Sequence, residues 1–166
     1  MESPNLKLRI IKSNELIQIE DLLRIRMSYS NDADLASTSN RYFAELSEKD
    51  NRVFLLGFEN DNSPFGYVQL ILVNADNDPQ LADGVQIAHI HDLRVRSDLQ
   101  GKGFGRGLIK YLEEEAHLRG IKTLTLGVDN WNSRAIQFYK NLNYSEFKQE
   151  PGRTDDEFVI CMQKTI

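Results

Sequence analysis

The feature that most constrains this chain is a run of alternating glycines between a strand pattern and a helix pattern. The run is Gly101-Lys102-Gly103-Phe104-Gly105-Arg106-Gly107, directly after Gln100. Glycine has no Cβ, so the backbone there can approach a ligand closely and adopt positive φ. At a helix start, unpaired N–H groups point into the positive end of the helix dipole. The run therefore predicts a phosphate-binding loop, with Lys102 and Arg106 as cations at its edge.

Two other phosphate-loop patterns fit this run poorly. The dinucleotide-binding pattern G-x-G-x-x-G needs glycine in sixth place, where counts from Gly101 and Gly103 reach Arg106 and Leu108. A Walker A loop needs Ser or Thr after its lysine, but Gly103 follows Lys102. A flexible loop without a ligand is the remaining alternative, although interior glycines cost roughly 0.5–1 kcal/mol each.

Hydrophobic periodicity predicts alternating strands and helices along the chain. The expected strands are 6–10, 52–58, 65–73, 86–95, 121–128, 144–149 and 157–164. The expected helices are 16–27, 39–46, 105–119 and 132–142. The order βααβββαβαββ indicates an α/β fold, a mixed sheet of about seven strands with helices on both faces.

Length and composition favour one domain over residues 1–166, since a domain usually takes ~100–200 residues. The apolar runs are too short to cross a membrane, and the N-terminus lacks the layout of a secretory signal. The single Cys161 suits a reducing compartment, so we expect a cytoplasmic protein without membrane partners. The net charge of −5 disfavours a nucleic-acid partner.

Two motifs in this order resemble the GNAT superfamily of N-acetyltransferases. The pattern Gln-x-x-Gly-x-Gly from Gln100, after a strand ending in Leu93-Arg94-Val95, resembles the acyl-CoA-binding motif of that family. Segment 130–144 is similar to its second motif, with Asn143-Tyr144 where Gly-Phe is usual. Asn tolerates the left-handed cap conformation, so this departure is mild. The resemblance implies a single-domain GNAT-like fold, acetyl-CoA (coenzyme A) as co-substrate, and no metal.

The resemblance also implies where acetyl-CoA binds. Strands 86–95 and 121–128 would splay apart, and the pantetheine arm would pair with the backbone of the first. The cofactor-binding residues expected on this basis are Leu93, Arg94, Val95, Gln100, Gly101, Lys102, Gly103, Phe104, Gly105, Arg106, Asn132 and Ser133. Asn132 is equally well explained as a plain helix N-cap, and the two roles are compatible.

By the same resemblance, Tyr139 takes the place of the family's tyrosine general acid, one helical turn beyond Ala135. A phenol with a reference pKa of about 10 stays protonated at neutral pH and can donate to a thiolate. Without the resemblance, the pattern favours a core tyrosine on an apolar helix face.

The proton acceptor is expected on strand 86–95, where many family members carry a glutamate and this chain carries His89 and His91. Two residues apart, these histidines share one strand face. An imidazole with a reference pKa near 6.5 is suited to proton transfer at neutral pH. The pair resembles the serotonin-type (arylalkylamine) N-acetyltransferases, where two such histidines relay the proton of the amine through water. His91 is the first candidate, and Asp92, solvent water or a purely structural histidine pair are the alternatives.

These expectations add up to an N-acetyltransferase that moves acetyl from acetyl-CoA to a primary amine by direct attack in a ternary complex. A non-catalytic acyl-CoA-binding sensor domain is the alternative function. The acceptor, a small-molecule amine or a protein amine, stays open, as does a homodimer. Acidic residues in loops expected near the acceptor either attract a cationic amine or are simply solvated. They are Asp32, Asp34, Asp76, Asp78, Asp83, Asp155, Asp156 and Glu157.

Overall fold

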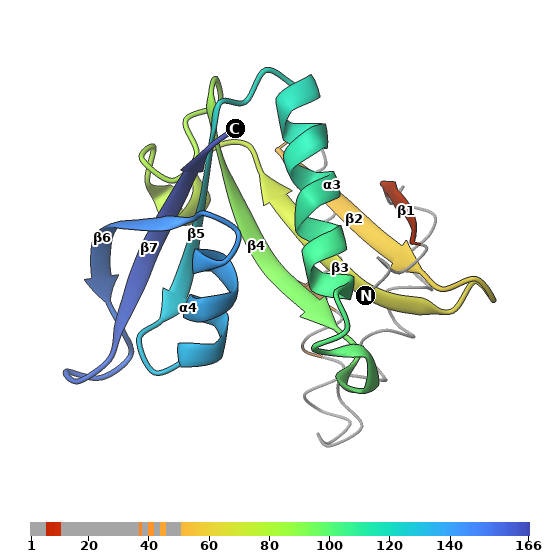
Figure 1. The fold of residues 1–166 in the computed structure, drawn as a ribbon. Coiled ribbons are helices and arrows are strands. Elements are labelled where there is room, and N and C mark those ends of the chain that lie inside the picture. Colours follow the sequence, from red (N-terminus) through yellow and green to blue (C-terminus); the bar gives the residue numbers. More distant parts are fainter. Residues whose placement is uncertain (1–5, 11–36, 38–39, 42–43, 46–50) are drawn as a thin grey trace. The chain divides into compact units, whose positions relative to one another are not determined.

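The computed structural model describes residues 6–10, 37, 40–41, 44–45 and 51–166 (Figure 1). Its strands are β1 Lys7–Ile10, β2 Arg52–Phe58, β3 Pro64–Ile71, β4 Ile87–Val95, β5 Thr123–Asp129, β6 Ser145–Pro151 and β7 Phe158–Thr165. The helices are α3 Phe104–Leu118 and α4 Ser133–Lys140, with short 3₁₀ turns η2 Ala75–Asn77 and η3 Ser97–Leu99. Hydrogen bonds join the strands in the order β1-β2-β3-β4-β5-β7-β6.

This architecture confirms the predicted mixed α/β fold with seven strands among the described residues. The expected helix 16–27 lies outside the described residues. In and next to segment 39–46, the described residues are all helical, namely Ser37, Asn40, Arg41, Ala44 and Glu45. Within the described part of the chain, no helix is long and apolar enough to cross a membrane.

The chain divides into two compact units that interleave in sequence. Unit 1 comprises Met1–Leu70 and Asp92–Leu112, and unit 2 comprises Ile71–His91 and Glu113–Ile166. Strand β4 and helix α3 each contribute residues to both units, and Figure 1 shows each as one continuous element. A single domain over the whole chain stays a prediction.

Unit 1 has its core along β2 and β3, whose residues are nearly all buried. Such continuous apolar runs are typical of strands covered on both faces. β1 pairs with β2 in antiparallel register from Lys7 opposite Phe58 to Ile10 opposite Leu55. At Gly66 an added Cβ would lie 2.5 Å from the Arg94 carbonyl oxygen, so only glycine allows this backbone approach.

Unit 2 is built around β5. The start of β4 pairs with it in parallel, from Ile87 opposite Thr123 to His89 opposite Thr125. Both strands continue beyond this three-residue pairing, β4 to Val95 and β5 to Asp129. On its other edge, β5 pairs with β7 along its whole length, and β7 pairs in turn with β6.

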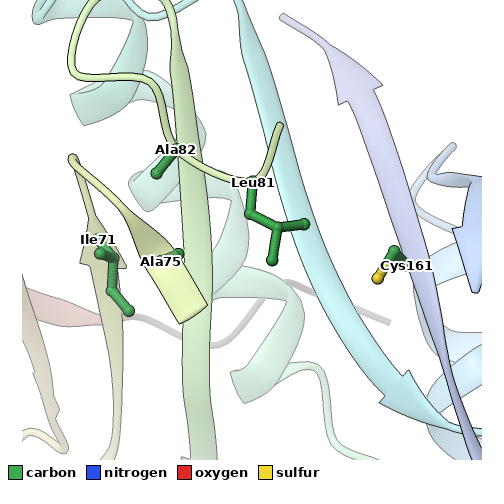
Figure 2. Packing of buried hydrophobic residues seen from close by; sticks show 5 residues of the cluster. All are labelled: Ile71, Ala75, Leu81, Ala82 and Cys161. Atoms are coloured by element: carbon green, nitrogen blue, oxygen red, sulfur yellow. The ribbon is translucent and has the colours of Figure 1, made fainter. Parts of the chain in front are cut away.

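One apolar cluster of unit 2 gathers side chains from β3, η2, the segment before β4, and β7 (Figure 2). It consists of Ile71, Ala75, Leu81, Ala82 and Cys161, and Phe147 and Val159 pack against it. Cys161 is 1% exposed, and burial raises the pKa of its thiol, which disfavours the reactive thiolate. The cluster therefore holds the segment around Leu81, which precedes β4 in the sequence, against the rest of unit 2.

Candidate active site

The glycine run has the backbone geometry that a phosphate site needs. Gly101 has φ of 76° and Gly103 has φ of 89°, both in the left-handed region that favours glycine. Helix α3 begins directly afterwards at Phe104, so its first N–H groups have no partner within the helix. Lys102 and Arg106 are exposed beside them. The arrangement fits a pyrophosphate through backbone donors, helix dipole and two cations.

The fourth glycine has a different role. Gly107 lies in the first turns of α3, where an added Cβ would run into the side chain of Leu6. Its small size serves packing inside unit 1 rather than ligand approach. The alternating pattern therefore combines left-handed residues at Gly101 and Gly103 with a packing position at Gly107, a distinction that spacing alone does not reveal.

Arg96, for which the sequence carries no functional signal, stabilises the turn between β4 and the glycine run. Its guanidinium binds both oxygens of Asp98, at 3.0 and 2.6 Å, and donates to Glu59 at 2.7 Å. The bond to Asp98 raises the pKa of Arg96, and Arg96 in turn lowers the pKa of Asp98. The Gln100 side chain donates to the Val95 carbonyl at 3.1 Å, which ties the loop to the end of β4.

The end of β4 holds the residues expected to meet the pantetheine arm. Asp92 has φ of 52°, so the regular alternation of the strand is interrupted there, before Leu93 and Val95. Its carboxylate accepts from the Tyr67 hydroxyl and from Arg94 Nε, both at 2.8 Å. The Arg94 side chain is therefore engaged with Asp92, and Asp92 already holds two hydrogen bonds.

The two histidines lie earlier on β4, in unit 2. His89 is 5% exposed, and its Nδ1 lies 2.8 Å from the hydroxyl of Thr125, its cross-strand neighbour on β5. The Thr125 hydroxyl also donates to the Leu81 carbonyl at 2.7 Å. His91 is half-buried. The sequence predicted the pair but gave no signal for Thr125, which is 36 residues away along the chain.

Tyr139 lies on α4 and is 8% exposed. Its ring contacts those of Phe138 and Tyr144 edge on, with centroids 5.0 and 5.7 Å apart. The turn after α4 places Asn143 at φ of 69°, which confirms that Asn adopts the left-handed conformation in place of the usual glycine. The Tyr144 N–H then donates to the Tyr139 carbonyl at 3.0 Å.

Asn132 is the N-cap of α4, since its Oδ1 accepts from the Ala135 N–H at 3.1 Å. This confirms the capping interpretation, and Ser133 next to it is exposed in the first turn. The preceding Trp131 is 65% exposed, so it is not a core residue of unit 2.

Two of the acidic loop residues expected near the acceptor have partners within the protein. Asp78 pairs with Lys148, an interaction that lowers the pKa of Asp78. Asp83 accepts from the backbone N–H groups of residues 85–87, each at 2.8 Å, and these bonds lower the pKa of its carboxyl. Asp155 and Asp156 are exposed. The carboxylates of Asp78 and Asp83 therefore stabilise the local structure of their loops.

The predicted site residues fall into two groups. Unit 1 holds Leu93, Arg94, Val95, Gln100, Gly101, Lys102, Gly103, Phe104, Gly105 and Arg106. Unit 2 holds His89, His91, Asn132, Ser133 and Tyr139. Among the residues that the structure describes, no group of His, Cys, Asp or Glu has the arrangement of a metal site.

Comparison with known proteins adds a family and a fold. A model described as the Acetyltransferase (GNAT) family matches residues 19–144. Over 105 residues the chain is 32% identical to an uncharacterised N-acetyltransferase of Methanocaldococcus jannaschii, covering 63% of this chain and 44% of that protein. Over 59 residues it is 37% identical to the ribosomal protein bS18-alanine N-acetyltransferase of Escherichia coli K12, covering 36% of this chain and 40% of that protein.

A solved structure extends the likeness to nearly the whole chain. It is an aminoglycoside 6'-N-acetyltransferase complexed with coenzyme A, at a TM-score of 0.70 and 21% identity, with 96% of both chains covered. At this identity, the likeness concerns the fold. The matched segments span less than half the length of the two relatives above.

Proposed function

The chain belongs to the GNAT family of acetyltransferases, and on this premise we propose that it is an acetyl-CoA-dependent N-acetyltransferase acting on a primary amine. The amine attacks the thioester directly in a ternary complex. The observation that carries the proposal is the left-handed backbone at Gly101 and Gly103 immediately before α3. A backbone of this kind lets the N–H groups before the helix approach a pyrophosphate closely.

Unit 1 would hold the acetyl-CoA. The N–H groups from Gly101 to Arg106 bind the pyrophosphate, with Lys102 and Arg106 adding charge. The backbone of 93–95 pairs with the pantetheine arm, as an added strand would. Asn132 of unit 2 caps α4 through its Oδ1, and its role toward the pantetheine amides is carried over from the family resemblance.

When bound, acetyl-CoA supplies an acetyl group activated as a thioester. An alkylamine has a pKa near ~10.4 and arrives protonated at neutral pH, so it must lose a proton before attack. His91 accepts that proton through water, and His89 shares the charge. Tyr139 donates its hydroxyl proton to the departing sulfur. Asp92 is a weaker candidate for the base because Tyr67 and Arg94 already bind its carboxylate.

The names of the relatives indicate two broad classes of amine acceptor. One acts by name on an alanine of a ribosomal protein, and a structural neighbour acts by name on an aminoglycoside. Both a protein amine and a small-molecule amine are therefore candidates here. The chain is proposed to work without a metal ion.

The test is incubation of the protein with acetyl-CoA and a panel of amines, followed by mass spectrometry of the products. The panel holds a polyamine, an arylalkylamine, an aminoglycoside, free lysine and a peptide with an N-terminal alanine. Isothermal titration with coenzyme A runs in parallel. Acetylated product supports the transferase. Tight coenzyme A binding without any product favours the sensor domain, and absence of binding contradicts both.

A further inference from the structure

Three polar groups of unit 2 form a short chain of hydrogen bonds that ends on a candidate catalytic histidine. His89 Nδ1 lies 2.8 Å from Thr125 Oγ1, and the same oxygen lies 2.7 Å from the Leu81 carbonyl. Thr125 is 0% exposed and His89 is 5% exposed. The two bonds are therefore shielded from bulk water, and Thr125 lies between its two partners.

Counting protons fixes the direction of each bond. The Leu81 carbonyl can only accept, so the single hydroxyl proton of Thr125 lies between Oγ1 and that carbonyl. The hydroxyl then presents only lone pairs to His89, and Nδ1 must carry the proton that bridges them. In the neutral ring, the lone pair is consequently on Nε2. The opposite tautomer would set two lone pairs against each other at one of these short distances.

The Leu81 carbonyl is held in place by its surroundings. The N–H groups of Leu81 and Ala82 both donate to the Asp78 carbonyl, at 3.1 and 3.3 Å. The Ala82 carbonyl accepts from the Asn74 N–H at 2.9 Å. The Leu81 side chain is buried in the apolar cluster with Cys161 (Figure 2). The Leu81 carbonyl, which accepts the hydroxyl proton of Thr125, is thus part of the folded core.

We propose that Thr125 is a positioning residue that fixes the tautomer of His89, so that Nε2 is the nitrogen that accepts a proton. The proposal rests on the proposed function, in which His89 shares the proton of the amine. When Nε2 takes up a proton, the bond from Nδ1 to Thr125 stays as it is. The bonds from Nδ1 to Thr125 and from Thr125 to Leu81 therefore need no rearrangement on proton uptake, which is the advantage of a preset hydrogen bond.

The first test measures the tautomer of His89 directly and needs no activity assay. Long-range ¹H–¹⁵N correlation spectra of the full chain, recorded where the rings are neutral, distinguish a protonated Nδ1 from a protonated Nε2. The chain has three histidines, and the cross-peaks lost in His89→Gln identify His89. We expect the Nδ1–H tautomer in the wild type. An Nε2–H ring in the wild type overturns the proposal.

Two substitutions of Thr125 test the role of its hydroxyl group. Thr125→Val keeps the shape and removes the acceptor, and Thr125→Ser keeps the acceptor as the matched control. We expect Ser to retain the Nδ1–H pattern and Val to lose it. A Val variant that folds and keeps the wild-type pattern shows that something other than Thr125 sets the tautomer. If Val fails to fold, the wild-type and Ser spectra decide, since an Nε2–H ring in either contradicts the proposal.

Kinetics separates this proposal from the proposed function. With an amine substrate in hand, Thr125→Val should lower kcat by roughly tenfold or more, within the reach of general base catalysis, at unchanged KM for acetyl-CoA. Thr125→Ser should stay near wild type. A changed tautomer with unchanged kcat would remove His89 from the mechanism, which overturns the catalytic half of the proposal. If the wild type does not bind coenzyme A, the result instead counts against the proposed function.

Discussion

The Tyr144 hydroxyl donates a 2.9 Å hydrogen bond to Oε1 of Glu113. The same carboxylate binds Lys164 Nζ through both oxygens, at 2.8 and 2.9 Å. The Tyr144 ring also packs edge on against the Tyr139 ring. Tyr144 therefore links the proposed general acid to an ion pair between α3 and β7, and it stands where the family usually has phenylalanine.

Tyr144→Phe tests this link through the pH dependence of stability. Burial, and next the charge of Glu113, raise the pKa of Tyr144 far above its ordinary value. Above pH ~10, the unfolded phenol ionises and the folded one does not, so the wild type loses stability as pH rises. The variant lacks this loss. We expect it to be less stable by about 1–2 kcal/mol near pH 8, with a smaller deficit near pH ~10.5.

Urea denaturation of both proteins at the two pH values measures the deficit. A deficit that is constant with pH would show that the Tyr144 hydroxyl is exposed to water in solution. A change of kcat accompanied by no change in stability would show that the hydroxyl acts on the reaction rather than on packing.

Tyr139→Phe should lower kcat by ~10²–10⁴, the usual reach of one general acid, while coenzyme A affinity and melting temperature stay near wild type. The ring, with its contacts to Phe138 and Tyr144, is retained, so packing is preserved. Melting curves and steady-state kinetics measure the two effects. A fall in melting temperature that parallels the loss of activity would favour the plain core tyrosine.

The strands and the backbone geometry of the glycine run were predictable because both depend on local patterns. Alternating and continuous apolar residues marked β2, β3 and β5 to within about two residues, and Gly101 and Gly103 have the positive φ that their type allows. The strand expected to reach Val73 ends at Ile71. The chain turns there through left-handed residues at Asn74, Asp76 and Asn77.

The partners of the site residues were not predictable from the sequence. Thr125 lies 36 residues from His89, and Leu81 lies 44 residues from Thr125. Tyr67 lies 25 residues from Asp92. No periodicity records such pairs, because they arise when separate strands come together. The chemical types of the candidates were therefore visible in the sequence, and their protonation and availability were not.

Gly103→Val should abolish coenzyme A binding. Valine at a φ of 89° is strained, and its side chain blocks the approach of the backbone to a phosphate. Gly107→Ala is the matched control, because its new Cβ meets only the end of the Leu6 side chain. We expect the control to lose some stability and keep its affinity. Isothermal titration of both variants checks this, and an unchanged affinity in Gly103→Val would place the phosphates elsewhere.

Asp92→Asn separates the two candidate bases. Asparagine tolerates the left-handed φ of 52°, its one oxygen can accept from Arg94 Nε in place of Oδ1, and its amide NH₂ then donates to the Tyr67 hydroxyl oxygen, so the fold is preserved while the basic group is lost. We expect kcat/KM within about tenfold of wild type, against a loss of ~10²–10⁴ in His91→Gln. The pH profiles of both variants, measured with saturating acetyl-CoA, make the comparison. If Asp92→Asn carries the large loss and His91→Gln the small one, the base is Asp92, and the histidines are structural.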